Sequence, residues 1–444
     1  MRIIMPYEVE NIIDTLMKSG YEAYAVGGCV RDSLMGKAPQ DWDICTDARP
    51  EQTMRVFSDK RVIETGLKHG TLALIIDGSS YEITTFRQDG EYRDNRRPDS
   101  VEFVSDIKKD LARRDFTINA LAYNHMRGLV DCFGGVSDIE NRMLRCVGSA
   151  KLRFEEDALR IMRALRFAST LGFEIERETD EAICLEKELL KNISSERIST
   201  ELSKMLLGES VGKVLLKYGD TLAVVIPEIK PMFGFKQNTP YHYLDVWEHT
   251  VKSVEEAPKD LTLRLTMLLH DIGKPSCYKF FDGKGHFHGH PGVSLEMAKR
   301  ILTRLKYDNN TAYMVTTLVR YHDVRILPES KDVRRWLSRI GEEALRALIE
   351  VKRADKLAQA EIFRQPAQDT LDIISKKIDE IITQQGCFSL KTLAVDGSDL
   401  IALGIPEGKQ IGESLSRLLD MVIDEKLPND RECLLEYVLK GTTD

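Results

Sequence analysis

Two aspartates separated by one residue follow a glycine turn near the start of the chain. The segment GGCVRD, residues 27–32, precedes Asp41-Trp42-Asp43. On a strand, residues i and i+2 point to the same face, so both carboxylates can reach one or two Mg²⁺ ions. A turn of Gly27 and Gly28 that leads into a helix lets backbone N–H groups approach a triphosphate. One metal ion lowers the pKa of an attacking 3′-hydroxyl, and the other neutralises charge on a leaving pyrophosphate. The order of turn, helix and aspartate pair therefore predicts a nucleotidyl-transfer site.

A third carboxylate follows on a later predicted strand. Glu82 alternates with Tyr81 and Ile83, so it can face the two aspartates and accept a proton. The alternative for Glu82 is an ordinary surface position on the strand. The polar segment Asp89–Pro98 is predicted to be a mobile loop near this site, or else a simple hairpin tip.

A predicted helix over Glu156–Phe167 has Asp157, Arg160 and Arg163 at i, i+3 and i+6. Cytosine and adenine both present an amino donor beside an unprotonated ring nitrogen. A carboxylate can accept from the amino group while a guanidinium donates to the ring nitrogen. Guanine and uracil reverse this pattern, so such a pair can discriminate by on the order of 10⁴-fold. The alternative is an ordinary salt bridge between Asp157 and Arg160 within the helix.

A second group of residues suits a metal site. Of the nine histidines in the chain, most fall in one region, where carboxylates accompany them. Imidazoles and carboxylates from successive helices suit a divalent transition metal, with room for a second ion or a water. A single histidine on a helix is more often a packed core residue, but a set in order favours a metal site. The candidate ligands are His249, His270, Asp271, His290, His322 and Asp355. His286 and His288 lie in a Gly-rich loop and are expected to be solvated.

The elements that must position these residues change in kind along the chain. Short strand patterns at Val62–Glu64, Thr71–Ile76, Tyr81–Thr85 and Val101–Val104 are separated by Gly, Asp and Pro turns. Beyond Lys151 apolar residues recur at spacings of three and four residues, which is the pattern of amphipathic helices. We expect an α+β fold, with a small mixed or antiparallel sheet in an N-terminal head and a mostly helical elongated body. The predicted domains are a head over 1–145, a neck over 146–225, a metal-binding domain over 226–365 and a helical tail over 366–444.

Composition excludes several classes of protein. The longest apolar stretches, such as Leu72–Ile76, fall far short of the ~20 residues of a membrane span, and residues 1–20 lack the pattern of a signal peptide. The eight cysteines are scattered without a CxxC pair, which argues against a disulfide framework or a thiolate zinc site. These features predict a cytoplasmic protein without a membrane partner. The net charge of −8 does not indicate a nucleic-acid partner, but local arginine clusters can still contact phosphates.

With its surroundings, the first site resembles a known family. GGCVRD and DWDI look like the signature of the polymerase-β-like nucleotidyltransferase superfamily, in the version shared by bacterial tRNA nucleotidyltransferases and poly(A) polymerases. KHGT at 68–71, EITTFR at 82–87, RRDFTINA at 113–120, DCFGG at 131–135 and EDALRIMRA at 156–164 follow in order. The resemblance implies the class II CCA-adding type, with Asp41, Asp43 and Glu82 as catalytic groups and Mg²⁺ at the two aspartates. It implies base reading by Asp157 and Arg160, and nucleotide binding also by Gly27, Gly28, Arg31, Arg114, Asp115, Asn119, Arg163 and Arg166.

The second group resembles the HD phosphohydrolase family through WEHT, LHDIGK and ADK around His249, His270-Asp271 and Asp355. The resemblance implies that these four residues are core metal ligands. It leaves His290 and His322 for a second metal or for phosphate contacts, and a phosphomonoester or 2′,3′-cyclic phosphate as substrate.

Three functions remain open from the sequence. The first is addition and repair of the CCA end of tRNA from CTP and ATP, by a monomer or homodimer. The second is A addition alone or poly(A) synthesis, although the unbroken Asp89–Pro98 loop argues against a CC-only enzyme. The third is a metal-dependent phosphohydrolase whose head only binds RNA.

Overall fold

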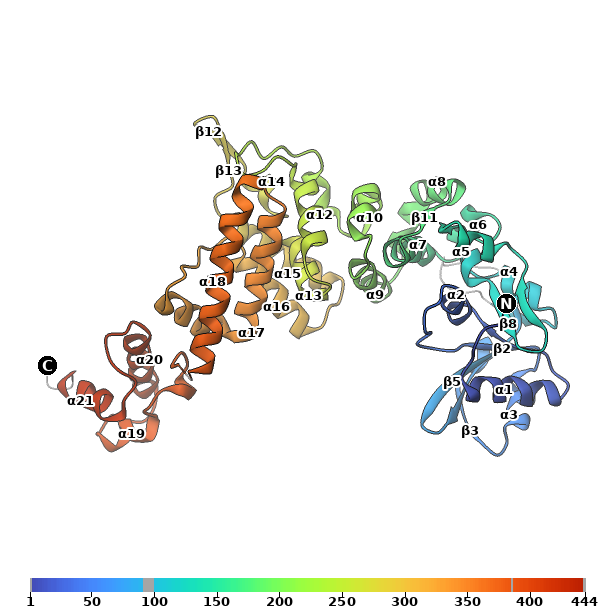
Figure 1. The fold of residues 1–444 in the computed structure, drawn as a ribbon, viewed down its shortest axis with the longest axis horizontal. Helices are drawn as coiled ribbons and strands as arrows, with labels where there is room; N and C mark the ends of the chain where they lie inside the picture. The colour runs from blue at the N-terminus through green and yellow to red at the C-terminus, as the bar shows by residue number, and fades with distance from the viewer. Residues whose placement is uncertain (1, 91–99, 385, 442–444) are drawn as a thin grey trace. The chain divides into compact units, whose positions relative to one another are not determined.

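The chain folds into two compact units, Met1–Pro227 and Glu228–Asp444, in a computed structural model that describes residues 2–90, 100–384 and 386–441 (Figure 1). Most of the predicted loop Asp89–Pro98 lies outside the described residues. The N-terminal sheet followed by helices confirms the predicted α+β class. The finer division into four domains stays a prediction.

A seven-stranded mixed sheet forms the centre of the head, in the order β3-β4-β5-β2-β1-β8-β9. Strands β2 and β5 are parallel, and every other neighbouring pair is antiparallel. The strands are β1 (Ala23–Val26), β2 (Ile44–Thr46), β3 (Arg61–Gly66), β4 (Thr71–Ile76), β5 (Ser79–Thr85), β8 (Leu121–Asn124) and β9 (Gly128–Asp131). The predicted strand near Val101 is β7 (Val101–Phe103), which pairs with β6 (Arg87–Asp89) outside this sheet.

Both faces of the sheet are covered, as alternate residues of β1 show. Ala23 and Ala25 belong to a core with helix α1 (Tyr7–Lys18), whereas Tyr24 and Val26 belong to a second core with helix α4 (Ile107–Ala112). Because successive side chains of a strand point to opposite faces, a central strand with both faces buried carries apolar residues throughout.

Helices complete the first unit. Helix α2 (Gly28–Leu34) follows β1, and α9 (Ser195–Leu206) packs against α7 (Leu159–Leu171). The other helices are α3 (Pro50–Val56), α5 (Gly135–Glu140), α6 (Ala150–Glu156), α8 (Arg177–Glu186), α10 (Val211–Lys217) and α11 (Gly219–Val225), with β10 (Met143–Leu144) beside β11 (Glu174–Ile175).

The prediction of one continuous helix over Glu156–Phe167 is wrong. Asp157 has extended backbone angles, φ −137° and ψ 101°, and ends α6 before α7 begins. A guanidinium from α9 contacts the residue at the break, because Arg197 Nη2 donates to Asp157 Oδ2 at 2.8 Å. An aspartate has low helix propensity, so one such tertiary bond is enough to favour the extended conformation.

The second unit is a bundle of helices followed by a tail. The bundle contains α12 (Val246–Glu256), α13 (Leu261–Leu269), α14 (Lys274–Cys277), α15 (His290–Arg304), α16 (Asn309–Tyr321), α17 (Ser330–Leu357) and α18 (Arg364–Thr383). A hairpin of β12 (Lys279–Phe281) and β13 (Lys284–His286) stands out from the bundle next to α14 (Figure 1). The tail helices are α19 (Gly397–Ala402), α20 (Lys409–Ile423) and α21 (Arg431–Gly441). None of the helices in the described part of the chain combines the length and apolar character needed to cross a membrane.

A pair of leucines tests the packing of the neck helices. Leu202 of α9 is fully buried, whereas Leu216 of α10 is 54% exposed. We expect Leu202→Ala to lower the free energy of unfolding by about 2–5 kcal/mol, because it leaves a cavity. Leu216→Ala should change the free energy of unfolding by no more than about 0.5 kcal/mol, because this side chain is largely exposed. Urea denaturation measures both, and equal losses would contradict the packing.

Candidate functional site

The three head carboxylates belong to two neighbouring segments of the sheet, since Asp41 and Asp43 directly precede β2 and Glu82 lies in the middle of β5. Ile44 of β2 lies opposite Ile83 of β5 in the parallel ladder, so Asp43 and Glu82 occupy adjacent positions on the same face. Asp41 and Asp43 lie just before β2 and are exposed, although they were predicted on the strand itself. The strand begins late because its partner β1 ends at Val26. The Asp43 carbonyl still accepts the Val26 N–H at 2.9 Å, and the chain then turns away at Gly27.

The electrostatics of the carboxylates show that they share one negative field. The pKa of Asp43 is raised, first because surrounding protein displaces water, and also by the Asp41 carboxylate, while Arg114 opposes the rise. The pKa of Glu82 is raised by loss of water and then by Asp43 and Asp41. Oxygen ligands of this charge are those that Mg²⁺ prefers. The donor set of Asp41, Asp43 and Glu82 therefore fits a hard divalent cation.

Gly27 is required where Arg114 approaches the turn. Its φ of +84° lies in the region that favours glycine, and a Cβ there would lie 3.0 Å from Arg114 Nη1. Arg114 is oriented in turn by the buried carboxylate of Asp110, whose Oδ2 lies 3.4 Å from Arg114 Nη2. Sequence reasoning missed Asp110, although its spacing of three and four residues before Arg113 and Arg114 is the signal that could have found it.

Four predicted nucleotide-binding residues form one hydrogen-bonded chain. Arg31 Nη1 donates to Asn119 Oδ1 at 2.6 Å, and Asn119 Nδ2 donates to Asp115 Oδ1 at 3.2 Å. Arg163 Nε donates to Asp115 Oδ2 at 2.7 Å. Burial alone would raise the pKa of Asp115, but the Arg163 charge and the hydrogen bonds from Arg163 and Asn119 lower it to about 2. This network links α2, the RRDFTINA segment and α7.

Phe167 of α7 lies at the centre of the same cluster. The guanidinium carbons of Arg31, Arg163 and Arg166 lie 5.2, 5.5 and 4.0 Å from the centre of its ring. Arg166 Nε also lies 2.9 Å from Glu201 Oε2 on α9. Cation–π contacts and this ion pair hold three positive groups together where mutual repulsion would otherwise separate them.

The two predicted base-reading residues have protein partners in this structure. Asp157 accepts from Arg197, as described above, and Leu159 N also donates to it at 3.1 Å. Arg160 Nη1 donates to Glu156 Oε2 at 2.6 Å, and Nη2 donates to the Arg113 carbonyl at 2.9 Å. A base read by this pair must therefore compete with, or add to, these contacts.

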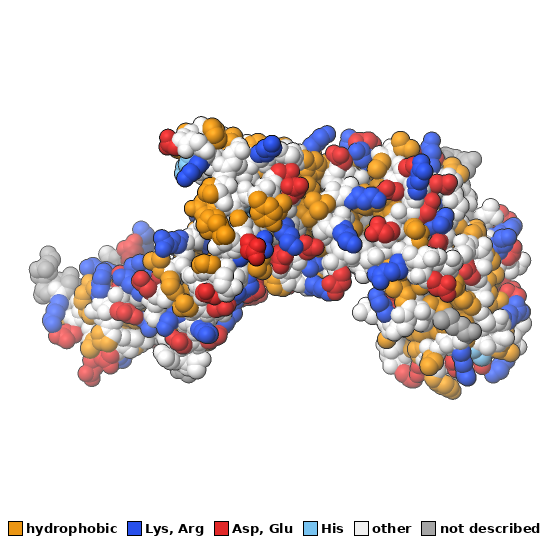
Figure 2. Space-filling model, turned by 45° about the horizontal axis from the view of Figure 1, so that its top comes forward, with side chains coloured by type: hydrophobic (Ala, Val, Ile, Leu, Met, Phe, Trp, Pro, Cys, Tyr) orange, Lys and Arg blue, Asp and Glu red, His pale blue; other side chains and the backbone are white. Residues whose placement is uncertain are grey.

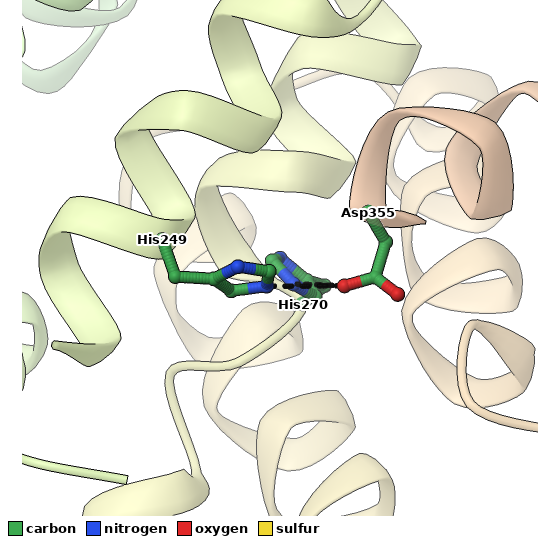
Figure 3. Close-up of side chains that lie close together, drawn as sticks. All are labelled: His249, His270 and Asp355. Carbon is green, nitrogen blue, oxygen red and sulfur yellow. Dashed lines mark hydrogen bonds and ion pairs between the residues drawn. The ribbon is translucent and has the colours of Figure 1, made fainter. Parts of the chain in front are cut away.

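In the second unit the predicted ligands converge from five helical segments. His249 on α12 places Nε2 3.0 Å from Asp355 Oδ1 on α17, and His270 Nε2 lies 3.8 Å from the same oxygen (Figure 3). His290 Nε2 at the start of α15 and His322 Nε2 at the end of α16 are 3.1 Å apart.

Asp271 lies between these two groups and contacts both. Its Oδ2 is 3.1 Å from His270 Nε2 and 3.5 Å from His249 Nε2, and its Oδ1 is 3.3 Å from His290 Nε2 and 3.6 Å from His322 Nε2. The possible ligand atoms form two sets, and within each set all atoms lie within 4.8 Å of one another. One set comes from His249, His270 and Asp355, and the other comes from Asp271, His290 and His322.

The chemistry of these donors fits a metal cation. His270 Nε2 and Asp271 Oδ2 are buried and lie 3.1 Å apart, and Lys274 Nζ lies 2.6 Å from the same carboxylate oxygen. Burial would lower the pKa of His270, but the Asp271 carboxylate raises it to about 9. A field that holds a proton on a buried imidazole also attracts a metal ion, and imidazole with carboxylate suits a transition metal. Sequence reasoning missed His242, whose ring centre lies 4.6 Å from that of His249; it precedes the helix and gives no periodic signal.

The sheet with its carboxylate cluster and the arginine network defines a nucleotidyltransferase. Family models agree: "Poly A polymerase head domain" matches residues 23–145, "Probable RNA and SrmB- binding site of polymerase A" matches 172–233, and "tRNA nucleotidyltransferase domain 2 putative" matches 290–438. A CCA-adding enzyme of Levilactobacillus brevis is 35% identical over 98% of both chains, and one of Streptococcus thermophilus is 32% identical over 96% of this chain and 95% of its own. The chain belongs to the CCA-adding enzyme family.

A solved structure supports the same relationship. The Bacillus stearothermophilus CCA-adding enzyme in complex with CTP matches with a TM-score of 0.76 and 28% identity, over 99% of this chain and 98% of that one. The match extends through both compact units, so the fold as well as the sequence is that of the family.

Acid titration tests the buried network. The pKa of Asp115 is about 2 in the folded chain and about 4 when unfolded, so its charge stabilises the fold above pH ~4, and this stability is lost as the pH falls through ~2. We expect Asp115→Asn to lower the free energy of unfolding by about 2 kcal/mol at neutral pH. The difference from the wild type should narrow below pH 4 in urea denaturation, and a constant difference would contradict the assignment.

Proposed function

We propose that this enzyme adds and repairs the 3′-terminal CCA sequence of tRNA, using CTP and ATP without a nucleic-acid template. The observation that carries the proposal is the cluster of Asp41, Asp43 and Glu82 beside the Gly27 turn, in a chain of this family. The alternatives of A addition alone or poly(A) synthesis have the same head chemistry, so the products of the reaction must distinguish them.

The head residues have distinct roles in this proposal. Asp41 and Asp43 would hold Mg²⁺, and the bound cation would supply a lower pKa for the 3′-hydroxyl of the RNA and charge neutralisation for the leaving pyrophosphate. The 3′ oxygen forms a bond to the α-phosphorus of the NTP as the bond to pyrophosphate breaks. Glu82, whose raised pKa favours proton uptake, is the candidate acceptor of the hydroxyl proton. Arg114 contacts the triphosphate beside Gly27 and Gly28.

Base selection is assigned to Asp157, at the end of α6, and to Arg160 of α7. Asp157 accepts from the amino group of cytosine or adenine, and Arg160 donates to the ring nitrogen. Arg31, Asp115, Asn119, Arg163 and Arg166 form the wall of the nucleotide site through the network around Phe167. In this structure Asp157 is paired with Arg197, and Arg160 is paired with Glu156. If an incoming base replaced these two partners, Asp157 and Arg160 would become available for base selection only when a nucleotide binds.

The RNA partner is supported by the family rather than by bulk charge. Figure 2 shows basic and acidic side chains interspersed over the face in view, without one broad basic stripe. A tRNA contact would therefore depend on local groups such as the neck arginines. A cytoplasmic location and a monomeric or homodimeric state stay predictions.

The product sequence tests the proposed reaction. The protein is incubated with a tRNA that lacks all three terminal nucleotides, one that lacks only the last A, and a complete tRNA, with CTP, ATP or both. We expect C, C and A to be added in order, followed by a stop. A long A tract, or A addition alone, would refute CCA synthesis.

The catalytic carboxylates give a sharper prediction. Asp41→Ala should abolish nucleotide incorporation, because the substitution removes a proposed metal ligand. The Kd for tRNA should stay within about twofold of the wild-type value, because the substitution removes no RNA contact. Asp59→Ala is the matched control, an exposed aspartate of the same head that pairs with Lys60. Single-turnover incorporation and filter binding measure the two properties. Retained incorporation in Asp41→Ala would remove this residue from the metal site.

We propose a second activity, a metal-dependent phosphohydrolase of the HD type, in the second unit. Two neighbouring sets of three ligands support this proposal, because paired metal positions suit phosphoester hydrolysis. Asp271 belongs to one set and also contacts His249 and His270 of the other. His249, His270, Asp271 and Asp355 would hold one divalent transition metal, and His290 and His322 with Asp271 would hold a second. Water adds to the phosphorus of a phosphomonoester or 2′,3′-cyclic phosphate, and the alcohol oxygen leaves with a proton. A hydrolase whose head only binds RNA is the remaining alternative.

Separate sites predict separable losses. Asp271→Ala should abolish Mn²⁺-dependent release of phosphate and spare CCA addition, since the ligands all belong to the second unit. Asp379→Ala, an exposed position on α18, is the control. Equal loss of both activities in Asp271→Ala, with the control intact, would contradict two sites.

A further inference from the structure

A lysine of α17 holds the end of α16 beside the candidate metal ligands. Lys352 Nζ donates to the His322 carbonyl at 2.7 Å and also donates to the Val324 carbonyl. The last carbonyls of a helix have no partner within the helix, and a cation at this end also interacts favourably with the helix dipole. Lys352 itself offers no lone pair to a metal ion while it is charged. It therefore caps α16 from the neighbouring helix without being a ligand.

The turn that Lys352 caps determines where the ring of His322 points. The helix ends at Tyr321, and His322 is the residue that follows it. His322 Nδ1 lies 2.7 Å from the Val319 carbonyl oxygen. Because a carbonyl only accepts, Nδ1 carries the proton, and Nε2 of the neutral ring keeps its lone pair for a metal ion. The direction of Nε2 therefore depends on the backbone of this last turn.

Two other ligand histidines are oriented by backbone carbonyls in the same way. His270 follows the end of α13, and its Nδ1 lies 2.7 Å from the Met267 carbonyl oxygen. His290 Nδ1 lies 2.9 Å from the Phe287 carbonyl oxygen. Such outer contacts fix the orientation of a ligand ring, and their loss typically lowers metal affinity about 10- to 100-fold.

The histidines of the hairpin segment lie outside the two ligand sets. His286 is half-buried, and its ring stacks on Phe281 with centres 3.7 Å apart. This position corrects the expectation that His286 is solvated. His288 is exposed, as expected.

The ligand atoms of the second set face one another at short range. His290 Nε2 and His322 Nε2 are 3.1 Å apart, and Asp271 Oδ1 lies 3.3 and 3.6 Å from them. Because the Nδ1 atoms of both rings donate to carbonyls, both Nε2 atoms present lone pairs when the rings are neutral. Three acceptor atoms at these distances repel one another until a cation binds between them. The backbone must therefore hold His322 in place against this repulsion.

The same helix that carries Lys352 also carries a ligand of the first set. Lys352 and Asp355 are three residues apart, so they share a face of α17. Asp355 Oδ2 accepts from Gln359 Nε2 at 3.0 Å, while Asp355 Oδ1 lies 3.0 Å from His249 Nε2. The first set is thus held by contacts that do not involve Lys352. The second set depends on Lys352 through the end of α16.

We propose that Lys352 is a positioning residue that holds His322 where it meets Asp271 and His290 around the second cation. The inference rests on the proposed metal-dependent phosphohydrolase and adds the residue that controls its second metal position. The hydrogen bonds of Lys352 go to backbone carbonyls and not to ligand atoms, so it acts through the position of His322. Loss of Lys352 weakens the second cation and spares the first.

Mn²⁺ binding to the full chain tests this role. All proteins carry Asp43→Asn, which removes a proposed ligand of the head site. Equilibrium dialysis measures the Kd of each Mn²⁺, and electron paramagnetic resonance detects the magnetic coupling of a close pair. We expect Lys352→Met to raise the Kd of the second Mn²⁺ about 10- to 100-fold, to leave the Kd of the first unchanged, and to replace the coupled signal by that of an isolated ion. Lys331→Met is the control, since Lys331 lies on the same helix and pairs with Asp424 of the tail.

A double-mutant comparison separates positioning from a general effect on the fold. His322→Ala alone should weaken the second cation. Adding Lys352→Met should then change its Kd little, because Lys352 acts through His322. Additive losses, or an equal loss of both cations, would overturn the positioning role. If Lys352→Met does not fold, Lys352→Gln replaces it, and the same directions are expected.

The outcomes distinguish this role from the proposed hydrolase. A coupled pair of Mn²⁺ ions with unchanged affinity in the Lys352 variant would overturn the role of Lys352 and leave the metal centre standing. If the parent protein binds no close pair, both proposals fail. Phosphate release is measured separately with the wild-type chain. A pair that depends on Lys352 in a protein that releases no phosphate would remove the hydrolase and support the positioning role.

Discussion

The head is organised around a concentration of like charge. Asp41 and Asp43 directly precede β2, and Glu82 lies within the neighbouring parallel strand β5. Each of them raises the pKa of a neighbour or has its own pKa raised. Repulsion of this kind costs stability unless a cation offsets it. Arg114 offsets part of the charge, and Mg²⁺ with an incoming nucleotide would offset the rest. In the proposed mechanism the site is complete only when the substrate and its cation are bound.

The remainder of the first unit keeps this arrangement in place. Asp110 contacts Arg114, whose Nη1 approaches the turn at Gly27, and the φ of +84° at this turn favours glycine. Asp115 connects Arg31 on α2, through Asn119, with Arg163 on α7. A shift of α7 would therefore be felt at the glycine turn, which gives a physical route by which base selection and catalysis can be coupled.

Sequence patterns predicted what depends on local order and missed what depends on tertiary partners. Alternation on β5 placed Glu82 toward the aspartates, and the ladder with β2 agrees with that placement. The break at Asp157 was not predictable, because Arg197, which binds it, lies forty residues later. His242 was missed for the same reason, since only the fold brings it to His249. The strands β1, β8 and β9 were not predicted because they are short and lie between stronger signals, and the strand predicted at Asp41–Asp43 begins one residue later as β2.

The most direct measurement concerns the shared cation of the head. In protein that carries Asp271→Ala to remove the second site, Mn²⁺ binding is followed by electron paramagnetic resonance with and without CTP. The account predicts that CTP tightens Mn²⁺ binding and that adding Asp43→Asn abolishes the tightening. Equal Mn²⁺ binding with and without Asp43 would show that these carboxylates do not hold the metal, and it would contradict the proposed chemistry of the head.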